Sequence, residues 1–462
     1  MATLTKVPLP AFGRALALPA LPSKLFLARF TALRERMREQ QIDVIAVYGD
    51  REHFANLAYL TGLDPRFEEA LLLVSIAGRK LLLVGNECQG YLPDTKALGL
   101  DVALFQEFSL LGQPRGASRP LADILRCFGI GKGVRVGCVG WKYFTGRLIP
   151  GGDLALDVPA YLADLLRSLA GGRQRVVNAT AILMHPETGL RISNEPAQLA
   201  QFEYAGTVVS EGVRRVLRHL ASGVREQDLE RRLDAAGLPL SCHRMLGFGD
   251  KARRGLASAS ARVARRGDAF TVAFGVTGGL TCRAGVIARG PQDLPPRLRS
   301  FYPRFAANYF DCVATWYDAV GVGAVAGEVH RAVESVRDPK LFAFAVNLGH
   351  YLHLDEWVHS PFGRGSRVQL RSGMMLQADL IPVSKGPFCY SNAEDGVFLA
   401  DAALQRALAR QYPECWARCL KRRRFMADSL GICLHDTVFP TGNTPGWLPP
   451  YALDLDRVLT RS

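Results

Sequence analysis

Long apolar runs are missing from this chain of 462 residues. A membrane-spanning helix needs roughly 18 consecutive apolar residues, and no stretch of the sequence approaches that length. Prolines also interrupt the N-terminal stretch MATLTKVPLPAFGRALALPALPSK. With 48% hydrophobic and 22% charged residues, the composition is typical of a soluble globular protein. We therefore expect a cytoplasmic protein whose residues 1–24 form an arm along the surface.

Paired cysteines and nucleic-acid-binding motifs are missing as well. The ten cysteines include no CxxC pair, so neither a disulfide framework nor a structural zinc site is indicated. The net charge of +14 would attract phosphate groups, but the arginines are spread along the whole chain. The dense basic cluster at residues 421–424 lies in a helical pattern. We interpret it as a solvated face and expect no nucleic-acid partner, while an anionic substrate or partner stays open.

The first half of the sequence has the pattern of an α/β domain. Residues 23–41 begin with a serine and have apolar residues near helical spacing, which predicts an amphipathic helix. Short β-rich runs, VIAVYG, ALLLVS and KLLLVG, then alternate with helical segments at 119–128 and 158–170. This alternation predicts an α/β domain over residues 25–185.

The second half has a different pattern, after a Pro- and Gly-containing boundary at residues 184–198. Helical patterns are expected at 195–220, 225–236, 296–318, 324–337 and 401–429. Strand-like runs are expected at 240–248, 268–288, 342–348, 371–383 and 389–399. Helices and strands grouped in blocks predict an α+β domain over residues 195–430, followed by a C-terminal tail at 431–462.

Several strings resemble the creatinase and aminopeptidase P superfamily, the M24 family with the pita-bread fold. The N-terminal string is VIAVYGDREHFANLAYLTGLDPRFEEALLLV, and three later strings are NLGHYLHLDEW, SGMMLQADLIP and SNAEDGVFL, in the family's order. The resemblance covers most of residues 25–400. It implies an α/β creatinase-like N-terminal domain, an α+β pita-bread domain, a hydrolase activity and a homodimer.

In the metal-dependent members of this family, two aspartates on a hairpin, one histidine and two glutamates hold two divalent ions. Two adjacent cations need several carboxylates, and together they acidify a bridging water. By this resemblance, the positions of the two aspartates are occupied here by Ala273 and Ala284, in FTVAFGVTGGLTCRAGVI. Neither methyl group can bind a metal, so we expect no dinuclear centre.

The other three positions of the resemblance retain polar residues. His350 matches the ligand histidine, Asp379 takes the place of the first glutamate, and Glu394 matches the second. One histidine and two carboxylates could hold a single Mn, Fe or Zn ion. The alternative is that no metal cofactor is used.

Creatinase offers a family precedent for chemistry without metal, which requires a histidine acid or base and carboxylates that hold the substrate. His243 lies in the strand-like run before the hairpin, where creatinase carries its acid/base histidine. A second histidine that contacts substrate follows the ligand histidine in the family. Here either Trp357 or His359 takes that place, and His359 is our candidate.

Three further residues are candidates for substrate binding. Strand alternation places Cys282 on the same face as Ala284, so its thiol lies near the site and could also act as a nucleophile. Arg66 and Phe67, in GLDPRFEEA, belong to the domain that reaches into a neighbour's active site in creatinase-like dimers. The plainer alternative is a surface arginine and a core phenylalanine.

The leading hypothesis is a creatinase-like hydrolase or lyase that acts on a small polar C–N-bonded metabolite. It would use His243, His350, Asp379 and Glu394 and would lack a dinuclear centre. A first alternative is a mononuclear-metal peptidase that cuts Xaa-Pro bonds. A second is a pita-bread protein that binds a partner without catalysis.

Overall fold

The computed structural model describes residues 2–384, 386–388 and 391–461. The chain divides into two compact units, Leu21–Arg191 and a second that combines Met1–Ala20 with Ile192–Ser462. Every helix among the described residues is too short or too polar to span a lipid bilayer.

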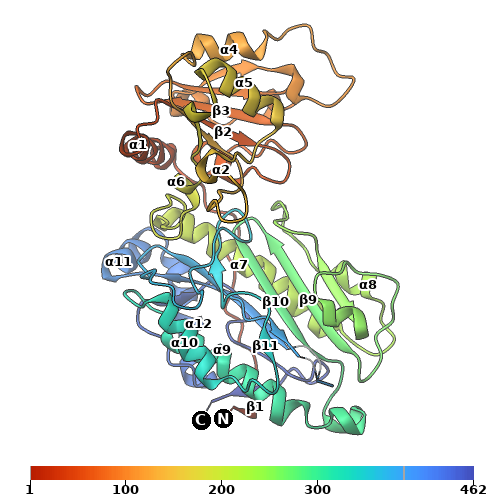
Figure 1. Cartoon of the computed structure of the whole chain (residues 1–462). Coiled ribbons are helices and arrows are strands. Elements are labelled where there is room, and N and C mark those ends of the chain that lie inside the picture. Colours follow the sequence, from red (N-terminus) through yellow and green to blue (C-terminus); the bar gives the residue numbers. More distant parts are fainter. Residues whose placement is uncertain (1, 385, 389–390, 462) are drawn as a thin grey trace. The chain divides into compact units, whose positions relative to one another are not determined.

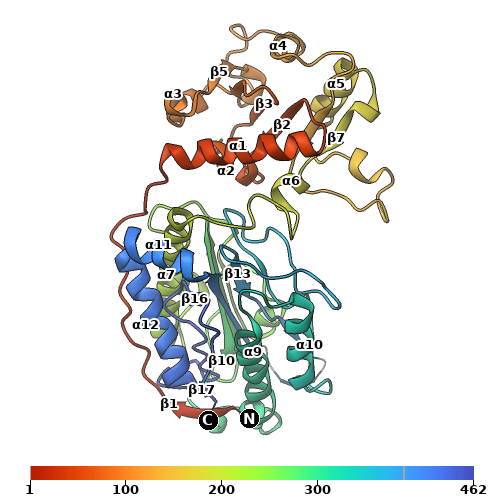
Figure 2. The same cartoon turned by 90° about the vertical axis from the view of Figure 1, so that its left-hand side faces the viewer.

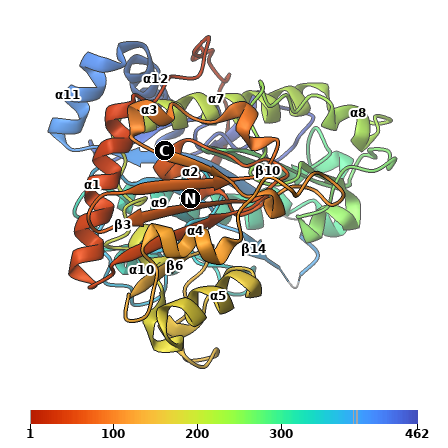
Figure 3. The same cartoon turned by 90° about the horizontal axis from the view of Figure 1, so that it is seen from above.

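The unit Leu21–Arg191 is a six-stranded sheet covered by helices on both faces. Its strand order is β5-β4-β3-β2-β6-β7, and the strands are β2 (Val44–Gly49), β3 (Ala70–Ser75), β4 (Lys80–Val84), β5 (Asp101–Leu104), β6 (Val136–Val139) and β7 (Val176–Asn178). The helices α4 (Leu121–Phe128) and α5 (Ala160–Ala170) pack on one face, where apolar side chains of β2 and β3 form a buried cluster with them. Helices α1 (Ser23–Glu39) and α2 (Ala55–Thr61) pack together beyond the other face (Figure 1; Figure 3 gives the view from above). The predicted helices at 23–41, 119–128 and 158–170 are confirmed.

The second unit is built on an antiparallel seven-stranded sheet with the order β12-β13-β15-β10-β9-β8, in which β16 also pairs with β15. The strands are β8 (Met245–Phe248), β9 (Ala269–Val276), β10 (Gly279–Val286), β12 (His350–Tyr351), β13 (Met375–Ala378), β15 (Asn392–Leu399) and β16 (Val438–Pro440). Helix α7 (Pro196–His219) packs on β9 and β10, and α12 (Pro413–Leu430) packs beside β16, with α11 (Ala402–Gln411) against both helices. Helix α9 (Ala307–Ala319) packs beside β13, with α10 (Ala326–Val336) against it (Figure 2).

The run at 268–288 forms the central hairpin, β9 and β10, as predicted. Its two-residue turn places Gly278 at φ +86°, a left-handed conformation that glycine adopts without strain. At Gly279 a Cβ would lie 2.8 Å from the carbonyl oxygen of Ala205 in α7. These glycines therefore let α7 pack directly against the end of the hairpin.

The two chain ends meet in this unit. Strand β1 (Thr3–Lys6) pairs with β17 (Arg457–Thr460), and the Asn443 side chain donates to the carbonyl of Gly13 at 3.0 Å. A second short pair joins β11 (Ala343–Phe344) to β14 (Pro382–Val383).

Several predicted elements of the second unit are shorter in the structure. The helix expected at 225–236 is α8, Glu226–Glu230 only. Beyond it the Asp234 carboxylate accepts from the backbone N–H of Ala236, and Ala236 has φ +52°. This local turn competes with the helix. The strand expected at 240–248 begins only at Met245.

Candidate active site

One face of the sheet carries a row of small and polar side chains at its centre. Cys282 of β10 lies opposite Ala273 of β9 and Glu394 of β15, while Ala284 lies opposite Thr271 and Asn392. Residues directly opposite each other in antiparallel strands point to the same face. Ala273 and Ala284 therefore lie on the same face as Glu394, and their methyl groups offer no metal ligand.

Three buried polar groups from separate strands converge beside this row. His350 comes from β12, Asp379 directly follows β13, and Glu394 comes from β15. The Nε2 atom of His350 lies 3.4 Å from Oε1 of Glu394 and 3.9 Å from Oδ2 of Asp379. One donor atom from each of the three lies within 4.8 Å of the others.

Burial dominates the electrostatics of these three groups. It raises the pKa of Asp379 well above its usual value, and the nearby Glu394 raises it further. It raises the pKa of Glu394 to about 8, with added repulsion from Glu356 and Asp395 and opposition from Arg283. It lowers the pKa of His350, although Asp379 opposes this. Two carboxylic acids held this close favour their neutral forms unless a cation lies between them.

The donor set fits a single divalent cation. Nδ1 of His350 lies 3.2 Å from the carbonyl oxygen of Tyr351, which can only accept, so Nδ1 carries the proton and Nε2 faces the two carboxylates. Among the described residues, the buried Oδ1 of Asp379 has no hydrogen-bond partner. An imidazole nitrogen and two carboxylates suit Zn, Fe or Mn and leave coordination positions open.

A cavity of about 190 Å³ opens onto these groups. Trp357 stacks on the His350 ring, with centroids 4.2 Å apart and an interplanar angle of 19°. Glu356 adds a further carboxylate, and Leu256, Met245 and Ile381 supply apolar walls. None of the described lining residues is a lysine or arginine. The cavity is therefore small, acidic and partly aromatic.

Cys282 lies in this cavity, as alternation predicts, and its Sγ accepts from Asn392 Nδ2 at 3.3 Å. Burial raises the pKa of its thiol well above the usual value, and the carboxylates of Glu394 and Asp379 add to this. The thiolate that a nucleophile requires is thus disfavoured.

The structure does not bring His243 to the cavity. The residue precedes β8 instead of lying within it. Its side chain is exposed, and Nε2 donates to the carbonyl of Leu256 at 2.7 Å. The expectation that His243 occupies a site strand is therefore wrong, because the strand begins two residues later.

The other expected binding residues also lie outside the described cavity lining. His359 is half-buried, and its Nδ1 lies 3.2 Å from the carbonyl of Ser360. Trp357, the alternative at this place, lines the cavity. Arg66 and Phe67 belong to the other compact unit, where both are exposed.

The sequence interpretation missed Glu356, Asn392 and Thr271 as cavity residues. Asn392 and Thr271 could have been found from strand alternation and register, since both share the face of Glu394. Glu356 lies in the irregular segment after β12. No periodic signal marks its position.

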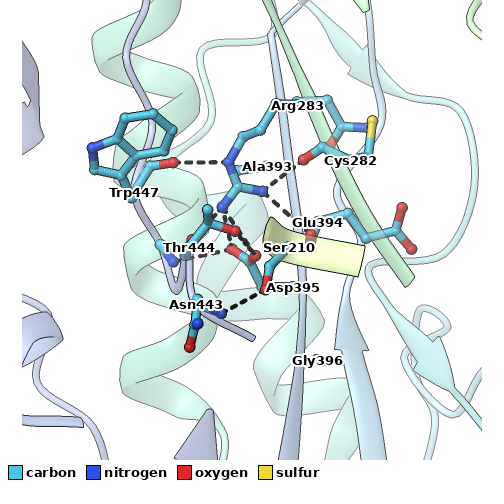
Figure 4. A network of polar contacts seen from close by, with 12 residues as sticks. Ser210, Cys282, Arg283, Ala393, Glu394, Asp395, Gly396, Asn443, Thr444 and Trp447 are labelled. Atoms are coloured by element: carbon cyan, nitrogen blue, oxygen red, sulfur yellow. Dashed lines mark hydrogen bonds and ion pairs between the residues drawn. The ribbon is translucent and has the colours of Figure 1, made fainter. Parts of the chain in front are cut away.

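A polar network fills the opposite face of β10 and β15 (Figure 4). The Arg283 guanidinium makes two hydrogen bonds to the Asp395 carboxylate, at 2.8 and 2.9 Å, and donates to the carbonyls of Trp447 and Thr444. It also donates to the carbonyl of Glu394 at 3.3 Å. Burial raises the pKa of Asp395, and the ion pair with Arg283 opposes that rise. The network ties the backbone of a cavity residue to the C-terminal segment.

Comparisons with solved structures identify the fold of the chain, whereas comparisons of its sequence identify no family. No protein-family model matches the chain, and no curated protein matches it. Among solved structures, the dipeptidase PepE from Mycobacterium ulcerans is similar with a TM-score of 0.62 at 18% identity, covering 84% of this chain and 95% of its own. A prolidase from Thermococcus sibiricus gives 0.63 at 15% identity, with 83% and 95% covered. An X-Pro aminopeptidase from Thermotoga maritima gives 0.60 at 13% identity, with 81% and 95% covered.

These likenesses extend over nearly the full length of the solved structures, and at such identities they show the fold alone. The chain has the mixed α/β pita-bread fold that its sequence motifs predict.

Proposed function

We propose that this chain is a hydrolase of a C–N bond in a small polar molecule and that it works without a dinuclear metal centre. The observation that carries the proposal is the convergence of His350, Asp379 and Glu394 within 4.8 Å at the base of a cavity. Burying three polar groups together is costly unless they bind something or satisfy one another. The names of the similar structures, dipeptidase and prolidase, agree with C–N bond hydrolysis.

The hairpin supports the absence of a second metal. Ala273 and Ala284 lie on the face of Glu394, at positions that resemble those of the two aspartates in the metal-dependent family. The retained donors His350, Asp379 and Glu394 suffice for one ion. The mononuclear version of the proposal therefore ranks first.

Each step of the proposed hydrolysis is assigned to side chains that line the cavity. His350 Nε2 and the carboxylates of Asp379 and Glu394 would hold one divalent cation, which when bound acidifies a water and polarises a carbonyl. The Glu356 carboxylate lines the same cavity and accepts the proton from the attacking water, then returns it to the leaving nitrogen. Trp357 and the apolar walls exclude bulk water and limit the substrate to a small molecule.

A second candidate is the creatinase-like reaction without metal. It is favoured by the acidic cavity, because no arginine or lysine belongs to its described lining, and the carboxylates would then hold a cationic substrate group. His350 would have to serve as acid and base alone, since His243 lies outside the cavity. Because the cavity has only one histidine among its described lining residues, the metal-free reaction ranks behind the mononuclear-metal reaction.

A turnover screen separates these functions. Xaa-Pro dipeptides, amino-acid amides and small amidines would be incubated with chelator-treated protein, with and without added Mn, Fe or Zn. We expect hydrolysis only with metal, and its loss in Asp379→Ala. Hydrolysis that persists with chelator would favour the metal-free reaction, and no turnover of any substrate would favour the non-catalytic alternative.

A further inference from the structure

We propose that a second cavity, on the outer helical layer of the pita-bread unit, binds a small phosphorylated ligand. This cavity has a volume of about 690 Å³, within the range of small-molecule sites. One wall is α10 from Gly327 to Glu334, and the other is the segment 364–367, with the sequence RGSR. The residues differ from those that line the candidate active site.

The two walls are held together by backbone contacts. The N–H of Ala326 donates to the carbonyl of Val368 at 2.9 Å, and Nδ1 of His330 lies 3.1 Å from the carbonyl of Phe362. A Cβ at Gly327 would lie 2.3 Å from the carbonyl oxygen of Ser366, so only glycine allows this approach. The cavity is therefore bounded by fixed backbone.

The charges in this cavity do not balance. Its two carboxylates are already paired: Glu328 lies 2.7 Å from Arg331, and Glu334 lies 2.6 Å from Arg337. Arg364 and Arg367, on the other wall, form no ion pair with any described residue. Two exposed guanidinium groups thus remain for a ligand.

An anion with several oxygens matches this arrangement. Guanidinium groups bind phosphate through pairs of parallel hydrogen bonds. The N-terminal end of α10, at Gly327, adds a weaker attraction for negative charge. The net charge of +14 raises the local concentration of anions around the whole molecule. Since the cavity is far larger than one phosphate needs, the ligand class is a phosphate ester or a polyphosphate.

Calorimetric titration of the chelator-treated full chain with pyrophosphate tests the proposal. We expect binding of one pyrophosphate per chain that weakens as salt increases, and at least tenfold weaker binding in the double variant Arg364→Gln/Arg367→Gln. Arg406→Gln, an exposed arginine on α11, is the matched control and should bind as the wild type does. The replaced side chains are exposed, and thermal unfolding checks that the variants fold.

His350→Ala separates this site from the proposed active site, and it should bind pyrophosphate normally. Absence of pyrophosphate binding would overturn the proposal, as would equal binding in the double variant. Binding of a single-stranded oligonucleotide without binding of pyrophosphate would also overturn it, because the basic residues would then form a nucleic-acid surface.

Discussion

The two faces of the β10–β15 strand pair differ in whether their buried charges are balanced. On one face, Arg283 and Asp395 form a complete ion pair with hydrogen bonds to the surrounding backbone. On the other, the two carboxylates of Asp379 and Glu394 lie beside a single histidine, and one carboxylate oxygen has no partner among the described residues. Both sets are buried, so exposure to solvent does not distinguish them.

This difference distinguishes buried charges that stabilise the fold from buried charges that are arranged to bind a ligand. A buried charge that is fully paired stabilises a particular arrangement of the chain, and its removal leaves the partner unpaired. A buried cluster with an excess of one sign stays ionised only when a counter-ion or ligand binds to it, and otherwise it takes up protons.

The largest effect is expected from Arg283→Met. The Asp395 carboxylate would stay buried without its partner, so the free energy of unfolding should fall by about 3–5 kcal/mol, measured by urea denaturation. The double variant Arg283→Met/Asp395→Leu should lose less, because no charge is left unpaired. A loss below about 1 kcal/mol in the single variant would contradict a structural role for the pair.

On the cavity face, Glu356→Gln should reduce turnover about 100-fold or more, the range of general acid–base catalysis, while metal uptake stays unchanged. Steady-state kinetics on a substrate from the turnover screen would measure this. Glu414→Gln, an exposed carboxylate on α12, is the control. Equal turnover in Glu356→Gln and the control would remove Glu356 from the mechanism.

The pH dependence of stability tests the same comparison at Glu203, another buried carboxylate that is fully paired. Burial alone would raise its pKa, but the attraction of Arg422 and Arg418 outweighs burial, and the net pKa is lowered. The ionised triad therefore stabilises the fold above the unfolded pKa of about 4.3, and this contribution is lost as the pH falls through the folded value.

We therefore expect the free energy of unfolding to fall with acid more steeply in the wild type than in Glu203→Gln, as measured by urea denaturation from neutral to acidic pH. Parallel curves would show that the triad does not stabilise the ionised carboxylate.

The smallest effect is expected from His243→Ala. The side chain is exposed and contacts the carbonyl of Leu256, so the free energy of unfolding should change by less than about 0.5 kcal/mol, with no change in turnover. A tenfold loss of turnover would restore His243 to the reaction and strengthen the metal-free alternative.

Periodicity predicted much of the fold because it reports burial directly. The central hairpin and the helices α1, α4 and α5 follow from alternation and helical spacing. The predicted helix at 225–236 failed where the side chain of Asp234 formed a local turn. Residues between strands carry no such signal.

The site residues likewise divide into those that a sequence pattern predicted and those that it did not. His350, Asp379 and Glu394 were found because short strings resemble a family, and the structure brings them together. Cys282 followed from alternation. Glu356 and Trp357 lie in an irregular segment whose path depends on contacts distant in sequence, so sequence alone could not choose between Trp357 and His359.

The number of metal ions bound per chain decides whether His350, Asp379 and Glu394 hold a single ion. Protein purified without a histidine tag would be incubated with Mn, Fe, Co or Zn, freed of excess ions and assayed by elemental analysis, beside the variants His350→Ala and His359→Ala. We expect one ion per chain in the wild type and His359→Ala and none in His350→Ala. Two ions per chain, or one ion that survives His350→Ala, would contradict this assignment.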